Sequence, residues 1–141
     1  MPNMIKGYLL DTHVFLWLML GCAHLKEAPV RTLASAAASG GLRVSPITCW
    51  EVAMLAARGR VHLGMPCQEW IAQSLSAPGL SVLDLSAQIA VEAAELPGQF
   101  HGDPADRILV ACARVKNIAL ATRDAKILAY AQEGYLQVLP C

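Results

Sequence analysis

Short apolar segments of strand length alternate along this chain with longer segments that have the periodicity of helices. The short segments are apolar throughout, so they lack the alternation of a strand with one face in water. Such strands are typical of a parallel sheet that is covered by helices on both faces. We therefore predict an α/β fold whose strands are 5–10, 42–45, 80–85, 118–122 and 136–139.

Helices are predicted between the strands, and several have clear signals at their ends. Ser45 followed by Pro46 fits an N-cap with proline at the first helical position, and Gly59 marks the end of that helix. Ser86 and Asp103 are further N-cap candidates. The predicted helices are 12–20, 29–38, 46–58, 66–75, 86–96, 103–116 and 125–132.

Four acidic residues stand where an apolar segment ends or inside a predicted helix: Asp11, Glu51, Asp106 and Asp124. A carboxylate in such surroundings is costly to desolvate unless something pairs with it. Convergence on one divalent cation would offset all four costs. In parallel sheets, ligands bind at the carboxyl ends of the strands. Asp11 and Asp124 both follow strands, so they face each other if the first and fourth strands are neighbours.

Carboxylates in this number are what Mg²⁺ or Mn²⁺ requires, since these ions prefer oxygen ligands. We expect Asp11 to be the central ligand, with Asp106 and Asp124 beside it. Glu51 would bind through water or position the nucleophile. Such a cation would polarise a scissile phosphate. Nearby hydroxyls that are expected to hydrogen-bond these carboxylates are those of Thr12 and Thr122.

Each acid also has a simpler structural explanation. Asp103 before Pro104 is first of all a helix N-cap, and Asp106 suits the dipole of the same first turn. Asp11 and Asp124 are candidate caps as well. His13, His62 and His101 have no partner at metal-ligand spacing, and Trp17, Trp50 and Trp70 are expected in the core. The prediction of a metal site therefore depends on the set rather than on any one residue.

The length of the chain points to one small domain, residues 1–141. Charged residues are only 16% of the chain, and this low content favours a homodimer or a protein partner. Eleven Lys and Arg balance eleven Asp and Glu, so five acids gathered at one site leave five excess positive charges elsewhere. Candidates to contact a nucleic-acid backbone are Arg107, Arg123, Arg58 and Arg60.

The five cysteines are widely spaced, with no pair at zinc-ligand spacing. We therefore expect reduced thiols in a cytoplasmic protein. The uninterrupted apolar run that begins at Val14 is too short to span a bilayer, so no membrane association is expected.

Four motifs in this order resemble the PIN-domain ribonucleases, above all the VapC-type toxins of bacterial toxin–antitoxin pairs. They are LLDTH at 9–13, WEVA at 50–53, DPADRILVA at 103–111 and ATRD at 121–124. The resemblance implies a three-layer α/β/α fold with a five-stranded parallel sheet of order 3-2-1-4-5. It also implies RNA cleavage dependent on Mg²⁺ or Mn²⁺, a homodimer, and inhibition by a small cognate antitoxin.

By position, Asp11, Glu51, Asp106 and Asp124 match the acidic quartet of that family, and Asp103 matches an extra acid of some members. Many members carry another acid and an aromatic residue shortly after the fourth motif. This chain has Lys126 and Ile127 there, so a second metal site stays open.

Two other functions compete with the ribonuclease. A phosphorylatable receiver domain would need its acceptor aspartate after the third strand and a lysine after the fifth. Asp84 lies within the third segment, and only Pro140 and Cys141 follow the fifth. A catalytically weak PIN-like module that binds RNA or protein is the second alternative, and the complete acidic quartet argues against it.

Overall fold

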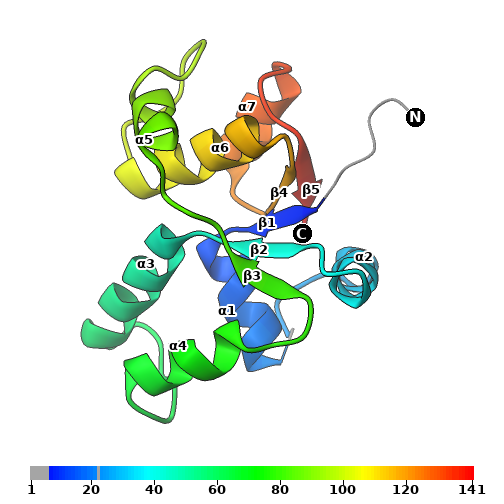
Figure 1. Ribbon diagram of the computed structural model, residues 1–141, viewed down its shortest axis with the longest axis vertical. Helices are drawn as coiled ribbons and strands as arrows, with labels where there is room; N and C mark the ends of the chain where they lie inside the picture. Colours follow the sequence, from blue (N-terminus) through cyan, green and yellow to red (C-terminus); the bar gives the residue numbers. More distant parts are fainter. Residues whose placement is uncertain (1–6, 22) are drawn as a thin grey trace.

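The computed structural model describes residues 7–21 and 23–141, in which strands and helices alternate (Figure 1). The strands are β1 Tyr8–Leu10, β2 Leu42–Val44, β3 Leu80–Val82, β4 Ala119–Thr122 and β5 Val138–Pro140. The helices are α1 Thr12–Leu20, α2 Glu27–Ala38, α3 Pro46–Ala57, α4 Cys67–Leu75, α5 Ala87–Ala94, α6 Pro104–Lys116 and α7 Ala125–Gln132. Ser45, Ser86 and Asp103 cap their helices as predicted.

The strands form one parallel sheet in the order β3-β2-β1-β4-β5, which confirms the predicted topology. β1 pairs with β4 in a register that places Leu9 beside Leu120 and Leu10 beside Ala121. The neighbouring carboxyl ends of β1 and β4 thus lie at one edge of the sheet. This adjacency brings the segments that follow the two strands together, as the prediction of a shared site requires.

Helices cover both faces of the sheet and make three layers. In Figure 1, α5, α6 and α7 lie above the sheet and α1, α3 and α4 lie below it, with α2 at the right. Leu33 of α2 packs with Phe15 of α1, so α2 belongs to the lower layer. Consecutive residues of β1 belong to different halves of the core: Leu9 packs with the upper layer and Leu10 with the lower one, and neither is exposed. Burial on both faces explains why the strands are apolar throughout.

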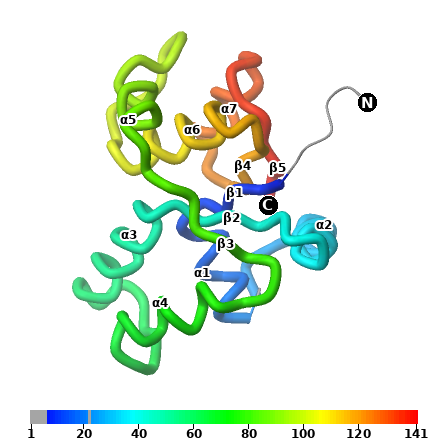
Figure 2. The backbone as a smooth tube through the Cα atoms, in the orientation of Figure 1, coloured from blue at the N-terminus to red at the C-terminus, as the bar shows by residue number. Residues whose placement is uncertain are grey.

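The strands depart from the predicted ranges, and within the described residues the largest differences are in β3 and β5. β3 ends at Val82 instead of Leu85, and β5 begins at Val138 instead of Leu136. β3 is an edge strand, and just after it the chain crosses from the lower helix layer to the upper one at α5, so pairing stops early (Figure 2). Residues 5 and 6 of the first predicted strand lie outside the described residues.

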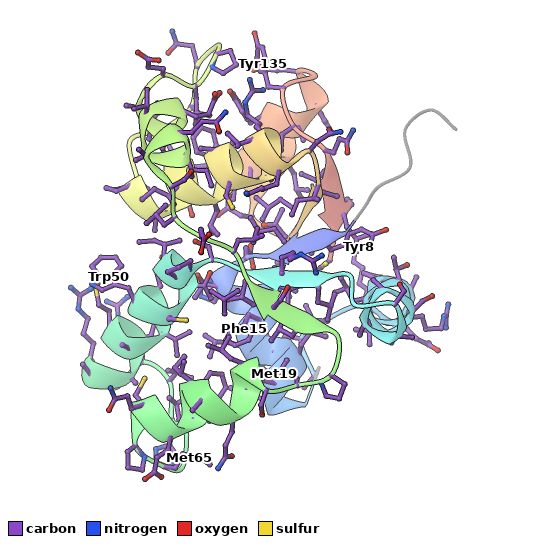
Figure 3. The ribbon with its side chains drawn as sticks, in the orientation of Figure 1. Tyr8, Phe15, Met19, Trp50, Met65 and Tyr135 are labelled. Atoms are coloured by element: carbon purple, nitrogen blue, oxygen red, sulfur yellow. The ribbon has the colours of Figure 1, made fainter. Side chains whose placement is uncertain are left out.

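The three tryptophans do not share one environment. Trp70 is buried as predicted, and Trp17 is half-buried. Trp50 is 54% exposed and points away from α3, so its prediction as a core residue is wrong (Figure 3). The buried face of α3 carries Thr48 and Val52, one turn apart, and Trp50 is two residues from each. Two residues are more than half a helical turn, which places Trp50 on the opposite side.

No helix in residues 7–21 and 23–141 is both long enough and apolar enough to cross a membrane. Cys49, Cys67, Cys112 and Cys141 are free thiols, as expected, and Cys22 lies outside the described residues.

Candidate active site

A cavity of about 220 Å³ lies at the carboxyl edge of the sheet, where β1 and β4 end. The five predicted acids line it together, with Thr12, His13 and Leu109 completing its wall. They are Asp11, Glu51, Asp103, Asp106 and Asp124. They come from the end of β1, the middle of α3, the start of α6 and the start of α7. Among its lining residues there is no Lys or Arg.

Asp11 is both a helix cap and a wall of the cavity. Its Oδ1 accepts a hydrogen bond of 2.8 Å from the backbone N–H of Val14, in the first turn of α1. Its Oδ2 accepts one of 2.5 Å from the hydroxyl of Thr122, as predicted. Burial raises the pKa of Asp11, and these two hydrogen bonds act in the opposite direction. The cap and the site are thus two roles of one carboxylate.

Glu51 has no capping role, since it lies in the middle of α3. Its Oε1 accepts a hydrogen bond from the hydroxyl of Thr12, as predicted for that threonine. The hydroxyl oxygen of Thr48 lies 3.4 Å from that of Thr12, so the buried face of α3 also contacts the start of α1. Burial raises the pKa of the half-buried Glu51 carboxyl. The first residue of α1 thereby orients an acid that lies 39 residues later in the chain.

Asp103 and Asp106 share the first turn of α6. Asp103 Oδ1 accepts from the backbone N–H of Asp106 at 2.9 Å, so Asp103 is the cap that the sequence predicts. The side chain of Asp106 is directed elsewhere and is one-quarter exposed, at 25%. Burial and then the negative charges of the four other cavity acids raise the pKa of Asp106 to about 7. The fold therefore opposes the ionisation of Asp106.

Asp124 caps α7, and its Oδ1 accepts from the backbone N–H groups of Lys126 and Ile127 at 2.9 and 3.0 Å. Thr122 supports this turn as well, because its Oγ1 accepts from the backbone N–H of Asp124 at 3.0 Å. The same threonine donates to Asp11, so one buried hydroxyl connects the ends of β1 and β4.

His101 belongs to the site, although it has no partner at metal-ligand spacing in the sequence. Its Nε2 lies 3.2 Å from Asp106 Oδ2, and its Nδ1 accepts from the backbone N–H of Asp103 at 3.3 Å. Neither sequence spacing nor periodicity places an imidazole there. The contact depends on the turn that leads into α6, which folds His101 back over the first turn of the helix.

The basic residues predicted to contact nucleic acid have different surroundings. Arg107 donates four hydrogen bonds to backbone carbonyls at 2.8–3.3 Å, those of Ala93, Ala94, Phe100 and His101. Its guanidinium holds the chain before α6, and contact of Arg107 with a phosphate stays a prediction. Arg123 is exposed beside the cavity. Arg58 and Arg60 are exposed after α3 and do not line the cavity.

The donor chemistry of the cavity fits a hard divalent cation, since five carboxylates surround a space without a basic side chain of Lys or Arg. Within residues 7–21 and 23–141, the structure does not group three His, Cys, Asp or Glu side chains closely enough to hold a metal ion. Glu51 is turned towards Thr12 and Asp106 towards His101. Repulsion between the negative carboxylates favours side-chain positions that keep them apart. A bound cation would instead favour positions that bring their oxygens together. Binding would therefore involve rotation of these side chains.

The known proteins most informative for this chain are PIN-domain ribonucleases. The family model described as PIN domain matches residues 8–133. Ribonuclease VapC22 of Mycobacterium tuberculosis is 32% identical over 119 residues, which cover 84% of this chain and 88% of that protein. This coverage includes the greater part of both proteins.

Solved structures share the fold at lower identity. The structure of VapBC2 from Rickettsia felis bound to a DNA fragment from its promoter has a TM-score of 0.67 at 18% identity, covering 94% of this chain and 97% of that chain. DNA-bound VapBC from Salmonella typhimurium has a TM-score of 0.68 at 15% identity, covering 97% and 98%. With the family match over nearly the whole sequence, the chain belongs to the PIN-domain family and to its VapC-type ribonucleases.

Proposed function

We propose that this protein is a metal-dependent endoribonuclease that hydrolyses RNA phosphodiester bonds and acts as the toxin of a toxin–antitoxin pair. The observation that carries the proposal is the cavity at the carboxyl edge of β1 and β4, which collects five carboxylates from four separate segments. Ribonuclease VapC22, at 32% identity, supports RNA as the substrate.

Asp11, Asp106 and Asp124 would hold Mg²⁺ or Mn²⁺, and Asp103 is an accessory acid at the same cavity. When bound, such a cation neutralises the carboxylates and stabilises charge that develops on the phosphate. The protein keeps its central ligand oriented through the Val14 N–H and the Thr122 hydroxyl. Rotation of Asp11 would cost both hydrogen bonds, so its oxygens are fixed before any ligand arrives.

Glu51 has a different task, which is to orient the attacking water. Its carboxylate is held by Thr12 on one wall of the cavity, and the charged groups that act on it are Asp11, Asp103 and His13. A carboxylate in this position accepts a hydrogen bond from water and keeps the water oxygen directed into the cavity. Loss of the Thr12 hydroxyl would leave Glu51 free to rotate away.

The direct test is cleavage of a labelled RNA by the purified protein with Mg²⁺, with Mn²⁺, and with excess chelator. We expect cleavage with either metal and none with chelator. Cleavage at full rate in chelator would contradict the metal mechanism. Binding of RNA without cleavage under any of these conditions would favour the alternative, a PIN-like module that binds and does not cut.

The partner proposed for this protein is a small antitoxin. A chain of the toxin–antitoxin complex from Klebsiella pneumoniae has the same fold, with a TM-score of 0.60 at 20% identity. The test is expression of the chain in the cytoplasm with and without the neighbouring open reading frame, followed by sequencing of the RNA ends that form. Relief of both growth arrest and RNA cleavage by the neighbour would support the pair.

A homodimer is proposed on the basis of surface composition. Only 16% of the residues are charged, and exposed apolar side chains include Trp50 at 54%, Leu85 at 44% and Val91 at 56%. Such residues are costly to leave in water when they gather in patches. Light scattering at micromolar concentration should give the mass of a dimer, and a monomer mass would contradict this proposal.

A further inference from the structure

A group of rings and one guanidinium lies next to the acidic cavity, and nothing in the proposed hydrolysis uses it. The ring of Trp17 has the imidazoles of His13 and His24 at centroid distances of 5.5 and 5.3 Å. The guanidinium carbon of Arg123 lies 5.1 Å from the centre of the Trp17 ring. We call these four residues the Trp17 cluster. Its His13, His24 and Arg123 are exposed, and Trp17 is half-buried.

The Trp17 cluster is continuous with the acidic cavity. His13 itself lines that cavity, one turn of α1 before Trp17. Arg123 stands between Thr122, which hydrogen-bonds Asp11, and Asp124, which also lines the cavity. A chain-like ligand with one group in the acidic cavity therefore meets the Trp17 cluster at its next group.

On its other side, the Trp17 cluster opens into a basic cavity of about 450 Å³. Its polar lining comes from His24, Lys26 and Arg123, and in the described residues no Asp or Glu side chain lines it. Cys141, which follows β5, forms part of its wall, and Arg123 follows β4. Because these strands are parallel neighbours, the acidic and basic cavities lie along the same edge of the sheet.

An acidic cavity followed by a basic one along this edge is an arrangement suited to a polyanion whose cleaved phosphate needs a cation. Five carboxylates repel a phosphate until a cation is bound, so the acidic cavity alone attracts RNA poorly. Arg123, next to Asp124 in the chain, places a positive charge beside the acidic cavity, and Lys26 adds another in the basic cavity. Arg123 uses one Nη1 hydrogen bond, of 2.7 Å, to hold the carbonyl of His24, which fixes the guanidinium next to Trp17. A guanidinium presents five N–H donors in all.

We propose that the Trp17 cluster and the basic cavity form a subsite for the nucleotide next to the scissile phosphate of single-stranded RNA. The rings stack with its base, and Arg123 and Lys26 bind its phosphate. Rings combined with a positively charged groove are the means by which proteins bind unpaired nucleic acid without a strict sequence preference. This inference rests on the proposed ribonuclease function, because it takes the acidic cavity as the place of the scissile bond.

An acidic protein segment is the main competing ligand, and the rings argue against it. The carboxylates of such a segment would pair with Lys26 and Arg123, but they offer no aromatic face to stack with the exposed imidazoles of His13 and His24. A base from duplex RNA is also excluded from stacking, because its faces are already covered by its neighbours in the helix. Single-stranded RNA uses both the charges and the rings.

The test compares variants of the full chain. Lys26→Ala removes one charge, and Lys116→Ala is its matched control, since Lys116 is exposed at the end of α6, near the amino end of β4. His24→Ala removes an exposed ring and keeps the carbonyl that Arg123 holds. Trp17→Leu removes stacking, and Trp17→Phe restores part of it. Thermal melting identifies any variant that fails to fold.

The probe is a fluorescein-labelled single-stranded RNA of mixed sequence, measured by anisotropy in chelator, where no cleavage is expected. Trp17→Leu should raise Kd about five- to a hundredfold, and Trp17→Phe should recover most of the loss. His24→Ala should also raise Kd. Lys26→Ala should weaken binding and lower the slope of log Kd against log salt by about 0.7. Lys116→Ala should match the wild type, and duplex RNA should be insensitive to Trp17→Leu.

Cleavage separates this subsite from the proposed function. With Mg²⁺, the three subsite substitutions should raise KM and leave kcat near its wild-type value, because they remove binding that the ground and transition states share. Wild-type cleavage together with unchanged Kd and KM in Trp17→Leu, His24→Ala and Lys26→Ala would overturn the subsite and leave the ribonuclease intact. Absence of cleavage with Trp17-dependent RNA binding would overturn the ribonuclease and keep the subsite. Loss of binding to a polyglutamate peptide alone would assign the surface to a protein partner and overturn the RNA proposal.

Discussion

Replacing Asp106 by asparagine should stabilise the protein in the absence of metal. Burial and the other cavity acids raise the pKa of Asp106 from 3.8 to about 7, so the folded state opposes its negative charge. Asparagine keeps the shape of the side chain and removes the charge. The cap of α6 should survive, because Asp103 accepts from the backbone N–H of residue 106 and not from its side chain.

The size of the effect follows from the pKa. A rise from 3.8 to about 7 is roughly three pH units, and at about 1.36 kcal/mol per unit the penalty would be about 4 kcal/mol for a carboxylate sealed from water. The Asp106 side chain is 25% exposed, so solvent screening reduces the penalty, and we expect about half of that value, roughly 2 kcal/mol. For a domain of this size the melting temperature of Asp106→Asn should rise by about 5–8 °C.

The sign of the pH dependence provides a second measurement. Because the folded pKa of Asp106 is above the unfolded one, the folded protein binds the proton more tightly between pH 3.8 and about 7. Stability therefore falls as the pH rises through this window, and the full penalty is present above it. The pKa values of Asp11 and Glu51 are also raised, so they act in the same direction. Wild-type protein in chelator should melt higher at pH 5 than at pH 8.

The assay is thermal unfolding by circular dichroism in chelator at both pH values. Asp106→Asn should reduce the difference between them, and added Mg²⁺ should raise the melting temperature of the wild type more than that of the variant. Glu133→Gln is the control, since Glu133 is exposed at the end of α7 and lies outside the cavity. An Asp106→Asn protein that melts at or below the wild type at pH 8 would refute the account of mutual repulsion.

Other substitutions test the ligand assignment and the frame around it. Asp11→Asn should lower the initial rate of RNA cleavage by at least about a hundredfold, whereas Asp103→Asn should be milder because asparagine replaces aspartate well as a cap; equal losses at the two positions would mean that the site is misassigned. Arg107→Ala leaves four carbonyls without their donor and should cost roughly 2–4 kcal/mol in urea unfolding, and a loss below about 1 kcal/mol would show that water replaces the guanidinium. Gly79→Ala would place a Cβ 2.0 Å from a backbone oxygen of α2 at a φ of +82°, so denaturation should show a larger loss than in Gly134→Ala, where φ is +95° and the space is open.

The part of the site that could be predicted from the sequence is the part built from local signals. An apolar strand followed within two residues by an acid locates Asp11 and Asp124 at the carboxyl edge, and proline after an acid locates Asp103 as a cap. Thr12 and Thr122 follow from the same reasoning, because each is adjacent to or within two residues of a cavity acid in the chain. Asp11 and Asp124 lie close together in space because β1 and β4 pair.

The remaining features depend on contacts between segments that are distant in the sequence. Arg107 reads as a surface cation, and its actual partners include a carbonyl fourteen residues earlier, at the end of α5. His101 has no partner at a recognisable spacing, because a turn and not a helix carries it to Asp106. Trp50 was misplaced because α3 is apolar on nearly all sides, so its periodicity does not identify the buried face.

The double use of the cavity aspartates has an evolutionary consequence. Asp11, Asp103 and Asp124 each cap a helix while they face the cavity, and asparagine can serve as the same cap. Every aspartate codon becomes an asparagine codon by a single base change. A lineage can therefore silence the cavity in one step without unfolding the protein. The silent form would keep every surface of its parent, so selection can act on catalysis and on partner binding separately.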